Sequence, residues 1–242
     1  MKQAVLEAPG EIRYREVPDP VPGSRDVVLE VKRIGICGSD LHVYKGKHPL
    51  VSFPLVQGHE FSGIVSAVGE GVADVERGTL VTVMPATAPP RSPERLMGLP
   101  ARSPQMQFIG GAIPGAGSEY FMVNEDYVVP MKPTTAPEDA AMVEPLAVAV
   151  HSVAMAGDLG REPVVVFGAG TIGILTALVA REWGAGDLVI VDRNAFRLGI
   201  AASLGLDTFE ITGSETGEEM VRRLGRTPGL AFECVGREEA LN

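Results

Sequence analysis

The sequence predicts two domains, an antiparallel β domain followed by an α/β domain built on a parallel sheet. Residues 1–84 alternate apolar and polar positions in short runs separated by turn residues, which is typical of antiparallel strands. From residue 163 onward, apolar strands alternate with helical segments, the pattern of a parallel sheet with crossover helices. With 29 glycines and 19 prolines among 242 residues, the composition argues against an all-helical fold, and a hydrophobic share of 45% supports a buried core.

In the β domain, the alternation predicts strands over residues 4–6, 12–17, 27–34, 61–68 and 80–84. Residues 85–104 contain six prolines, and four glycines follow between positions 110 and 117, so this segment is predicted as a long loop, neither a helix nor a central strand. Order resumes with a strand at residues 118–123. An Ala-rich helix is then expected to open at Pro137, with Thr135 as its cap.

The α/β part is predicted to begin with a strand over residues 163–167 and a helix that runs to Trp183. A second strand over 188–191 is followed by a helix, a third unit comprises a strand at 207–211 and a helix at 218–224, and a fourth strand spans 230–236. We therefore expect domains at residues 1–155 and 156–242.

Charge and cysteine content limit the classes of partner. The chain has 21 Lys and Arg against 31 Asp and Glu, a formal charge of −10, which disfavours a nucleic-acid partner. No basic-then-apolar leader and no membrane-spanning apolar run are seen, so no membrane association and a cytoplasmic location are expected. The two cysteines, Cys37 and Cys234, are far apart in sequence, and no disulfide framework is predicted.

A glycine turn follows the strand at 163–167 and opens the next helix. In this context the first glycine makes a tight turn, the second lets the backbone approach a pyrophosphate, and the third allows close packing of helix on strand. The helix N-terminus supplies N–H donors for phosphate. The alternative is a glycine-rich turn that binds no ligand.

Asp192 ends the second strand, 19 residues after Gly173, where a carboxylate can bind the adenosine ribose hydroxyls and repel a 2′-phosphate. NAD is therefore favoured over NADP, although the neighbouring Arg193 could hold such a phosphate if it is not simply a solvated charge. The predicted cofactor-binding residues are Gly168, Gly170, Thr171, Ile172, Gly173, Asp192 and Arg193.

Three separate segments carry residues of metal-ligand type: one from Cys37 to His42, one comprising Gly58-His59-Glu60, and Glu144-Pro145. Each segment alone is weak, because a lone cysteine or histidine is more often a packing residue. Together they supply the three protein ligands of a catalytic zinc, with one position open for substrate. A site with one thiolate and one carboxylate is formally neutral, and an alcohol bound there would lose its proton more readily.

A longer signature surrounds this histidine, with Gly58, His59 and Glu60 followed by Gly63, Gly69 and Val72. On these residues the chain resembles the zinc-containing medium-chain dehydrogenases, and among them the sorbitol, L-idonate and related polyol dehydrogenases. The resemblance extends from the first residue to the last. It implies a GroES-like catalytic domain followed by a Rossmann domain, and a protein that acts as a homodimer or homotetramer on a small alcohol or polyol.

The resemblance also implies roles for the site residues. Cys37 and His59 become zinc ligands, Glu60 is the adjacent carboxylate used at the metal, and Glu144 occupies the place of a second cysteine in classical alcohol dehydrogenases, which indicates the polyol branch.

The same comparison places proton transfer on the segment after the cysteine. Ser39 would take the substrate proton and His42 would pass it to solvent. Asp40 would orient His59 through the ring nitrogen that does not bind the metal. For Asp40 and His42, the alternative is turn capping near a strand end.

The sequence departs from the family in the proline-rich segment. At the spacing of the four cysteines that hold a structural zinc in many members, the chain has Pro89, Ser92, Arg95 and Ser103. None is a soft ligand, so one catalytic zinc and no structural zinc are expected, with the lobe held by its prolines and by packing, or mobile.

The second departure is length, since the resemblance implies two further strands and a final catalytic segment after the last predicted strand. On this basis the Rossmann domain is incomplete, and the chain is expected to be a fragment that by itself binds NAD poorly and turns over little.

The leading hypothesis is NAD-linked oxidation of a secondary hydroxyl of a polyol or sugar acid. A threonine-type or simple alcohol dehydrogenase is the alternative within the fold, and a non-catalytic zinc-binding remnant is the alternative of another class. Zinc-free quinone reduction is opposed by the intact ligand set.

Overall fold

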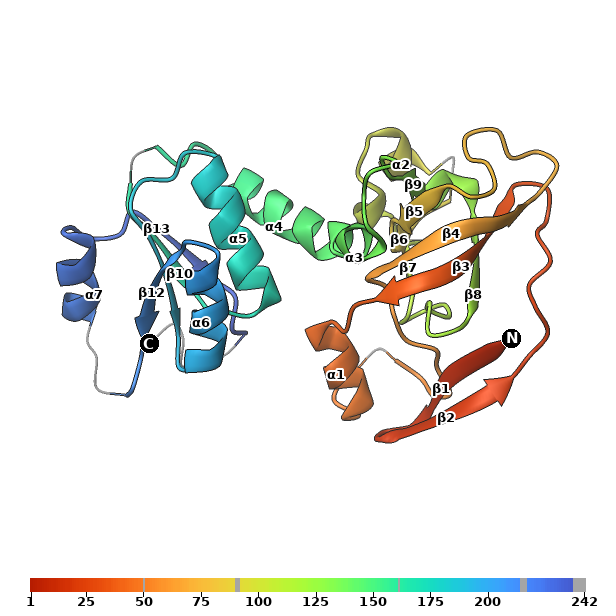
Figure 1. The fold of residues 1–242 in the computed structure, drawn as a ribbon, viewed down its shortest axis with the longest axis horizontal. Coiled ribbons are helices and arrows are strands. Elements are labelled where there is room, and N and C mark those ends of the chain that lie inside the picture. The colour runs from red at the N-terminus through yellow and green to blue at the C-terminus, as the bar shows by residue number, and fades with distance from the viewer. Residues whose placement is uncertain (50, 90–91, 161, 214–216, 237–242) are drawn as a thin grey trace. The chain divides into compact units, whose positions relative to one another are not determined.

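A computed structural model describes residues 1–49, 51–89, 92–160, 162–213 and 217–236 (Figure 1). The chain divides into two compact units, Met1–Glu144 and Pro145–Asn242. The boundary expected after residue 155 falls near the end of α4 (Val143–Ala156), the helix in which one unit passes into the other along the chain. Within the described ranges, none of the helices is both long and apolar enough to cross a membrane.

The first unit is built on a five-stranded antiparallel sheet. Its strand order is β8 (Tyr120–Asn124), β3 (Asp26–Ile34), β4 (Phe61–Val68), β5 (Leu80–Val83) and β9 (Val128–Pro130). These strands confirm the antiparallel β domain and the strands predicted from residue 27 onward. Alternate strand residues point to one face and form most of the core: Val27, Leu29, Phe61, Val65, Val81, Val83, Phe121 and Val123. Ile109, Ala116 and Tyr127, which lie outside these strands, complete it.

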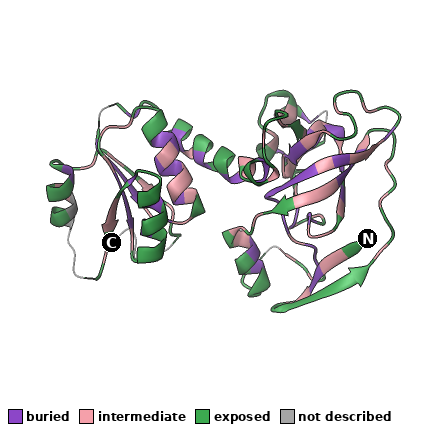
Figure 2. Ribbon diagram, in the orientation of Figure 1, coloured by how far each residue is buried: buried purple, intermediate pink, exposed green. Residues whose placement is uncertain are grey.

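A separate two-stranded ribbon is formed by β1 (Lys2–Ala8) and β2 (Glu11–Glu16). All six residues of β2 are exposed, as Figure 2 shows, whereas Leu6 of β1 is buried against Val43 and Leu55. Val43 belongs to α1 (Gly38–Tyr44), a short helix that the sequence analysis did not predict. Its first turn is polar, so the pattern there indicated only a turn.

The proline-rich segment contains more structure than the sequence predicted. Strand β6 (Ala86–Thr87) pairs with β7 (Gln107–Phe108), and α2 (Pro93–Leu96) and the 3₁₀ turn η1 (Pro100–Arg102) lie between them. The prediction that this segment holds no helix is therefore wrong for α2. Pro93 occupies the first helical position, where a missing N–H costs nothing, and the hydroxyl oxygen of Ser92 accepts from the backbone N–H of Arg95 at 3.3 Å.

Arg95 ties this lobe to the rest of the unit. Its guanidinium donates to the carbonyl oxygens of Ala88 at 3.2 Å and Asp126 at 3.3 Å, and lies 3.3 Å from the Asp126 carboxylate. It also stacks over the Tyr127 ring, 4.7 Å from the centroid. Hydrogen bonds and a cation–π contact thus hold the lobe, in addition to the packing that the sequence suggested.

The segment after β9 forms α3 (Pro137–Ala141) and then α4. The residue that precedes the first helical turn is Ala136, which offers no side-chain cap, so the expected cap at Thr135 is wrong. Thr135 instead closes a turn through its backbone N–H, which donates to the carbonyl of Lys132 at 2.9 Å. Pro137 at the first helical position starts the helix without a polar cap.

The second unit contains a parallel sheet in the order β12 (Asp207–Glu210), β11 (Leu188–Asp192), β10 (Val164–Phe167) and β13 (Leu230–Glu233). The pairings confirm the predicted βαβ units and the partial Rossmann domain.

Helices cover both faces of this sheet. The α5 (Thr171–Glu182) and α6 (Ala195–Ser203) helices pack on the face that carries Val164, Val166 and Ile190. The opposite face carries Val165, Val189 and Val191, against which α7 (Gly217–Leu224) places Leu224. Figure 1 shows α7 apart from α5 and α6. The central strands are therefore apolar on both sides, as expected for a parallel sheet.

We predict that Arg95→Met lowers the free energy of unfolding by about 1–2 kcal/mol, because the Asp126 carbonyl loses this donor and the contact with the Tyr127 ring is lost, while the Ala88 carbonyl keeps only the Tyr127 hydroxyl. The measurement is urea unfolding followed by circular dichroism. Arg102→Met, which removes an exposed arginine of the same lobe, is the matched control and should stay close to wild type. Equal stability of the two variants would show that Arg95 does not hold the lobe.

Candidate functional site

Three of the four predicted metal ligands lie together in the first unit. The ligand atoms of Cys37, His59 and Glu60 are all within 4.8 Å of one another, which makes them the one such group among the described residues. His59 and Glu60 are 4% and 8% exposed, and Cys37 is half-buried. The geometry is therefore that of a compact, largely buried cluster of a thiol, an imidazole and a carboxylate.

The β3–β4 ladder brings these residues together. Ile34 at the end of β3 pairs with Phe61 at the start of β4, and the pairing continues beyond the strands, where the Gly35 N–H donates to the Glu60 carbonyl at 2.6 Å. Cys37 follows one strand closely and Glu60 directly precedes the other. Two segments more than twenty residues apart in sequence therefore meet at one sheet end.

Two glycines make room at this point. A Cβ on Gly35 would lie 2.3 Å from Oε2 of Glu60, so any side chain there would displace the carboxylate. Gly58 has a φ of +104°, and a Cβ there would meet Cδ1 of Ile34 at 2.3 Å. The sequence analysis included Gly58 in its signature but missed Gly35, whose only signal was its place directly after a strand.

Asp40 lies beside two residues of the cluster, Cys37 and His59. Its Oδ2 accepts from the backbone N–H of Cys37 at 2.9 Å, which caps α1, and its Oδ1 lies 3.8 Å from Nδ1 of His59. The side-chain amide of Gln57, which the sequence analysis missed, donates to the Asp40 carbonyl at 3.0 Å and to Oδ1 at 3.4 Å. Both interpretations of Asp40, helix capping and facing His59, have a contact in the structure.

The acidic groups of the cluster resist ionisation in the absence of a cation. Burial raises the pKa of the Cys37 thiol, an effect that hydrogen bonds from the Ser39 hydroxyl and backbone partly oppose. Burial, with the Asp40 charge, also raises the pKa of Glu60. The pKa of Glu144 is raised by burial first and then by the charge of Glu60, which shows that Glu144 lies near the cluster although outside its tight group.

This donor set fits a zinc ion. A divalent cation would stabilise the charged forms that burial disfavours, and thiolate, imidazole and carboxylate are the ligands zinc prefers. Nδ1 of His59 is buried and makes no hydrogen bond to any described residue, while it faces the Asp40 carboxylate. An imidazole whose one nitrogen faces a carboxylate leaves the other nitrogen available for a metal.

The remaining predicted residues of this site lie on α1. Ser39 is half-buried beside Cys37, and His42 is exposed in the last turn of the helix. The structure also adds Phe108, whose ring meets His59 edge to face at a centroid distance of 4.9 Å. Phe108 gave no signal in the sequence, since the strand that carries it is only two residues long.

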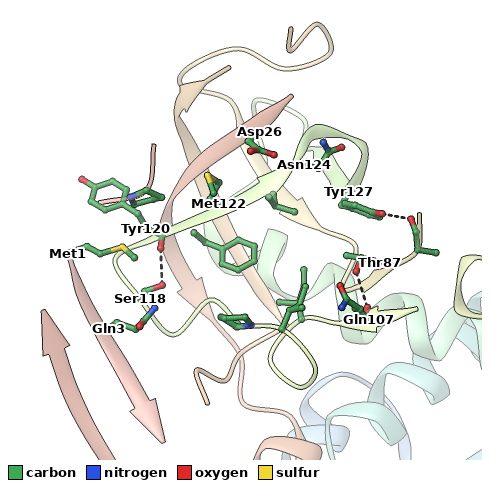
Figure 3. Close-up of a pocket in the computed structure, with 18 of the residues that line it drawn as sticks. Met1, Gln3, Asp26, Thr87, Gln107, Ser118, Tyr120, Met122, Asn124 and Tyr127 are labelled. Carbon is green, nitrogen blue, oxygen red and sulfur yellow. Dashed lines mark hydrogen bonds between the residues drawn. The ribbon is translucent and has the colours of Figure 1, made fainter. Parts of the chain in front are cut away.

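The first unit also has a pocket of about 530 Å³ along β8 and the proline-rich lobe (Figure 3). Tyr120, Met122, Asn124 and Tyr127 line it, and none of the predicted site residues does. This pocket is therefore separate from the candidate metal cluster.

In the second unit, the glycine turn lies between β10 and α5. Gly168 has a φ of +99°, and a Cβ on Gly173 would lie 1.7 Å from the Gly168 carbonyl oxygen. A Cβ on Gly170 would meet nothing within 4 Å, so the backbone there borders open space. Thr171 and Ile172 form the first turn of α5, whose N–H groups begin at this point.

Asp192 ends β11 beside the glycine turn. Its Oδ2 accepts from the backbone N–H of Ala169 at 2.7 Å, and its Oδ1 accepts from the N–H of Asn194 at 2.9 Å. Arg193 is exposed, whereas Arg197, which the sequence analysis did not consider, places its guanidinium 3.9 Å from the Asp192 carboxylate. The carboxylate is therefore held in one orientation by the backbone.

Known proteins are similar to this chain in sequence and in fold. Residues 23–133 match the alcohol dehydrogenase GroES-like domain. Sorbitol dehydrogenase of Ovis aries is 33% identical over 247 residues, covering 98% of this chain and 69% of the relative. A Sinorhizobium meliloti protein described as a zinc-binding dehydrogenase, solved with NADP, has a TM-score of 0.90 at 31% identity.

An Escherichia coli alcohol dehydrogenase solved with NADH has a TM-score of 0.89 at 29% identity. The two solved structures are covered over 71% and 72% of their length, and this chain is covered completely in both. These likenesses confirm the resemblance inferred from the Gly58-His59-Glu60 signature. The chain belongs to the zinc-containing medium-chain dehydrogenase family, with the polyol dehydrogenases as its relatives.

Proposed function

We propose that this protein oxidises a secondary hydroxyl of a polyol or sugar acid, with zinc at the Cys37 cluster and NAD as hydride acceptor. The observation that carries the proposal is the buried group formed by Cys37, His59 and Glu60, within a family of dehydrogenases. Such a group has three ligands of the types a catalytic zinc uses and requires a further position for substrate.

Cys37, His59 and Glu60 would hold the metal, and the nearby Glu144 carboxylate would add negative charge beside them. When bound, zinc supplies a Lewis acid that favours loss of the proton from a substrate hydroxyl. Ser39 hydrogen-bonds the Cys37 sulfur and so lies beside the cluster, where its hydroxyl can accept that proton while it passes its own proton on. His42, exposed on the same helix, can pass it to solvent.

The carboxylates at the site support a polyol as the substrate. Glu60 belongs to the cluster and Glu144 lies near it, so the site has two carboxylates where a simple alcohol needs only one hydrogen-bond acceptor. Carboxylate oxygens accept hydrogen bonds from the additional hydroxyls of a polyol. The sorbitol dehydrogenase relative, which is named for a polyol, supports this choice.

Asp192 supports NAD. Two backbone N–H groups fix its carboxylate beside the glycine turn, and each oxygen retains a lone pair for a ribose hydroxyl. The same negative charge disfavours the 2′-phosphate of NADP. Arg197 offsets only a small part of this charge, because its guanidinium lies 3.9 Å away and its side chain is more than half exposed, so solvent screens the interaction.

We predict about one zinc per chain in purified protein, measured by inductively coupled plasma mass spectrometry. Cys37→Ser should lose that zinc, because a serine hydroxyl does not ionise to a ligand near neutral pH. Cys234→Ser is the matched control and should keep it, since Cys234 lies in the second unit. Zinc retained in Cys37→Ser would refute the proposed site. Two zinc ions per wild-type chain would refute the expectation that the proline-rich lobe binds no structural zinc.

A second prediction concerns the cofactor. Asp192→Asn should weaken NADH binding about tenfold or more, because charge-assisted hydrogen bonds to ribose are lost. It should affect NADPH less, and fluorescence titration with both nucleotides measures the two effects. Asp187→Asn, at the opposite end of the same strand region, is the control and should change neither. Tighter binding of NADPH than NADH by the wild type would overturn the proposed preference.

A further inference from the structure

Gln57 occupies a well-defined place beside the metal cluster, two residues before His59. Its carbonyl accepts from the backbone N–H of Gly117 at 2.9 Å. The loop that carries Gly115 packs directly on this backbone, since a Cβ on Gly115 would lie 2.6 Å from the Gln57 carbonyl carbon. The main chain at Gln57 is therefore fixed independently of its side chain, and substitution of the side chain leaves that support in place.

The side chain of Gln57 reaches back to α1. Its amide donates to the Asp40 main-chain carbonyl at 3.0 Å and to Asp40 Oδ1 at 3.4 Å. Oδ1 is also the oxygen that lies 3.8 Å from Nδ1 of His59. The amide thus contacts the same carboxylate oxygen that faces the predicted zinc ligand.

Asp40 needs this second contact to hold its orientation. The Asp40 side chain is 11% exposed, and the other oxygen of its carboxylate is held by the Cys37 N–H. The torsion about the last bond of an aspartate side chain is soft, so one hydrogen bond fixes one oxygen and leaves the tilt of the carboxylate less determined. A donor on Oδ1 removes that freedom and also satisfies a buried charge.

We propose that Gln57 is a positioning residue for the metal site, which holds the Asp40 carboxylate toward Nδ1 of His59 and thereby presets the orientation of the imidazole. It acts through Asp40 and does not belong to the Cys37, His59 and Glu60 group. The inference rests on the proposed function, since it concerns the zinc site of that proposal. It assigns part of the zinc affinity of this chain to an amide outside the ligand set.

The test compares Gln57→Leu with wild type. Zinc affinity is measured by competition with a chromogenic chelator, and we expect a loss of about tenfold, the lower end of what outer contacts to metal ligands provide. With Co²⁺ in place of zinc, the visible absorption bands should shift, because the imidazole orientation changes the ligand field. Gln105→Leu, at an exposed position, is the matched control and should alter neither readout.

A double-substitution cycle with Asp40→Asn separates positioning from folding. If Gln57 acts through Asp40, the double variant binds zinc no more weakly than Asp40→Asn alone. Thermal unfolding of the metal-free Gln57→Leu protein should match that of Gln105→Leu.

Unchanged zinc affinity in Gln57→Leu would overturn the proposal. So would a loss of affinity with an unchanged cobalt spectrum and an equal loss of metal-free stability, since that pattern marks a purely structural role. Additive losses in the cycle would overturn it as well. A wild-type protein that binds no zinc would instead refute the proposed function, so the two failures are distinguishable.

Discussion

The metal cluster depends on one antiparallel pairing, the ladder between β3 and β4. It runs from Val27 opposite Val68 to Ile34 opposite Phe61 and ends with the hydrogen bond between Gly35 and Glu60. Because β4 begins beside the end of β3, the segment after β3 and the segment before β4 bring the Cys37 thiol close to the side chains of His59 and Glu60. The buried side chains of this sheet make the pairing rigid, and the site inherits that rigidity.

Both candidate sites use the same device, a carboxylate whose two oxygens are each held by a separate donor. At the metal cluster, the Cys37 N–H and the Gln57 amide hold Asp40. At the glycine turn, two backbone N–H groups hold Asp192. A carboxylate fixed in this way interacts with an imidazole or a ribose without first losing conformational freedom, so its effect on binding is larger than that of a mobile side chain.

The proline-rich lobe shows how a chain can order a surface segment without a soft metal ligand. Prolines restrict the backbone of its described residues, and Arg95, whose side chain is 20% exposed, connects it to Asp126 and Tyr127. An arginine can make several hydrogen bonds and a ring contact from one planar group. The lobe also carries Phe108, whose ring packs on His59. An ordered lobe therefore keeps this ring in contact with the candidate metal ligand.

The sequence by itself determined most of the strands, the βαβ units, the glycine turn, Asp192 and the ligand-type residues. These features are local, since alternation, glycine spacing and residue chemistry are visible within short windows. The tertiary structure decided the rest. It showed that α1 and α2 form and that Thr135 does not cap α3. It also showed that Gly35 leaves room for Glu60, that Gln57 contacts Asp40 and Phe108 contacts His59, and that Arg95 contacts Asp126. Gln57 and Asp40 are 17 residues apart in sequence, and Arg95 and Asp126 are 31 apart. A pattern within a short window does not encode such pairs, because only the folded chain brings their side chains together.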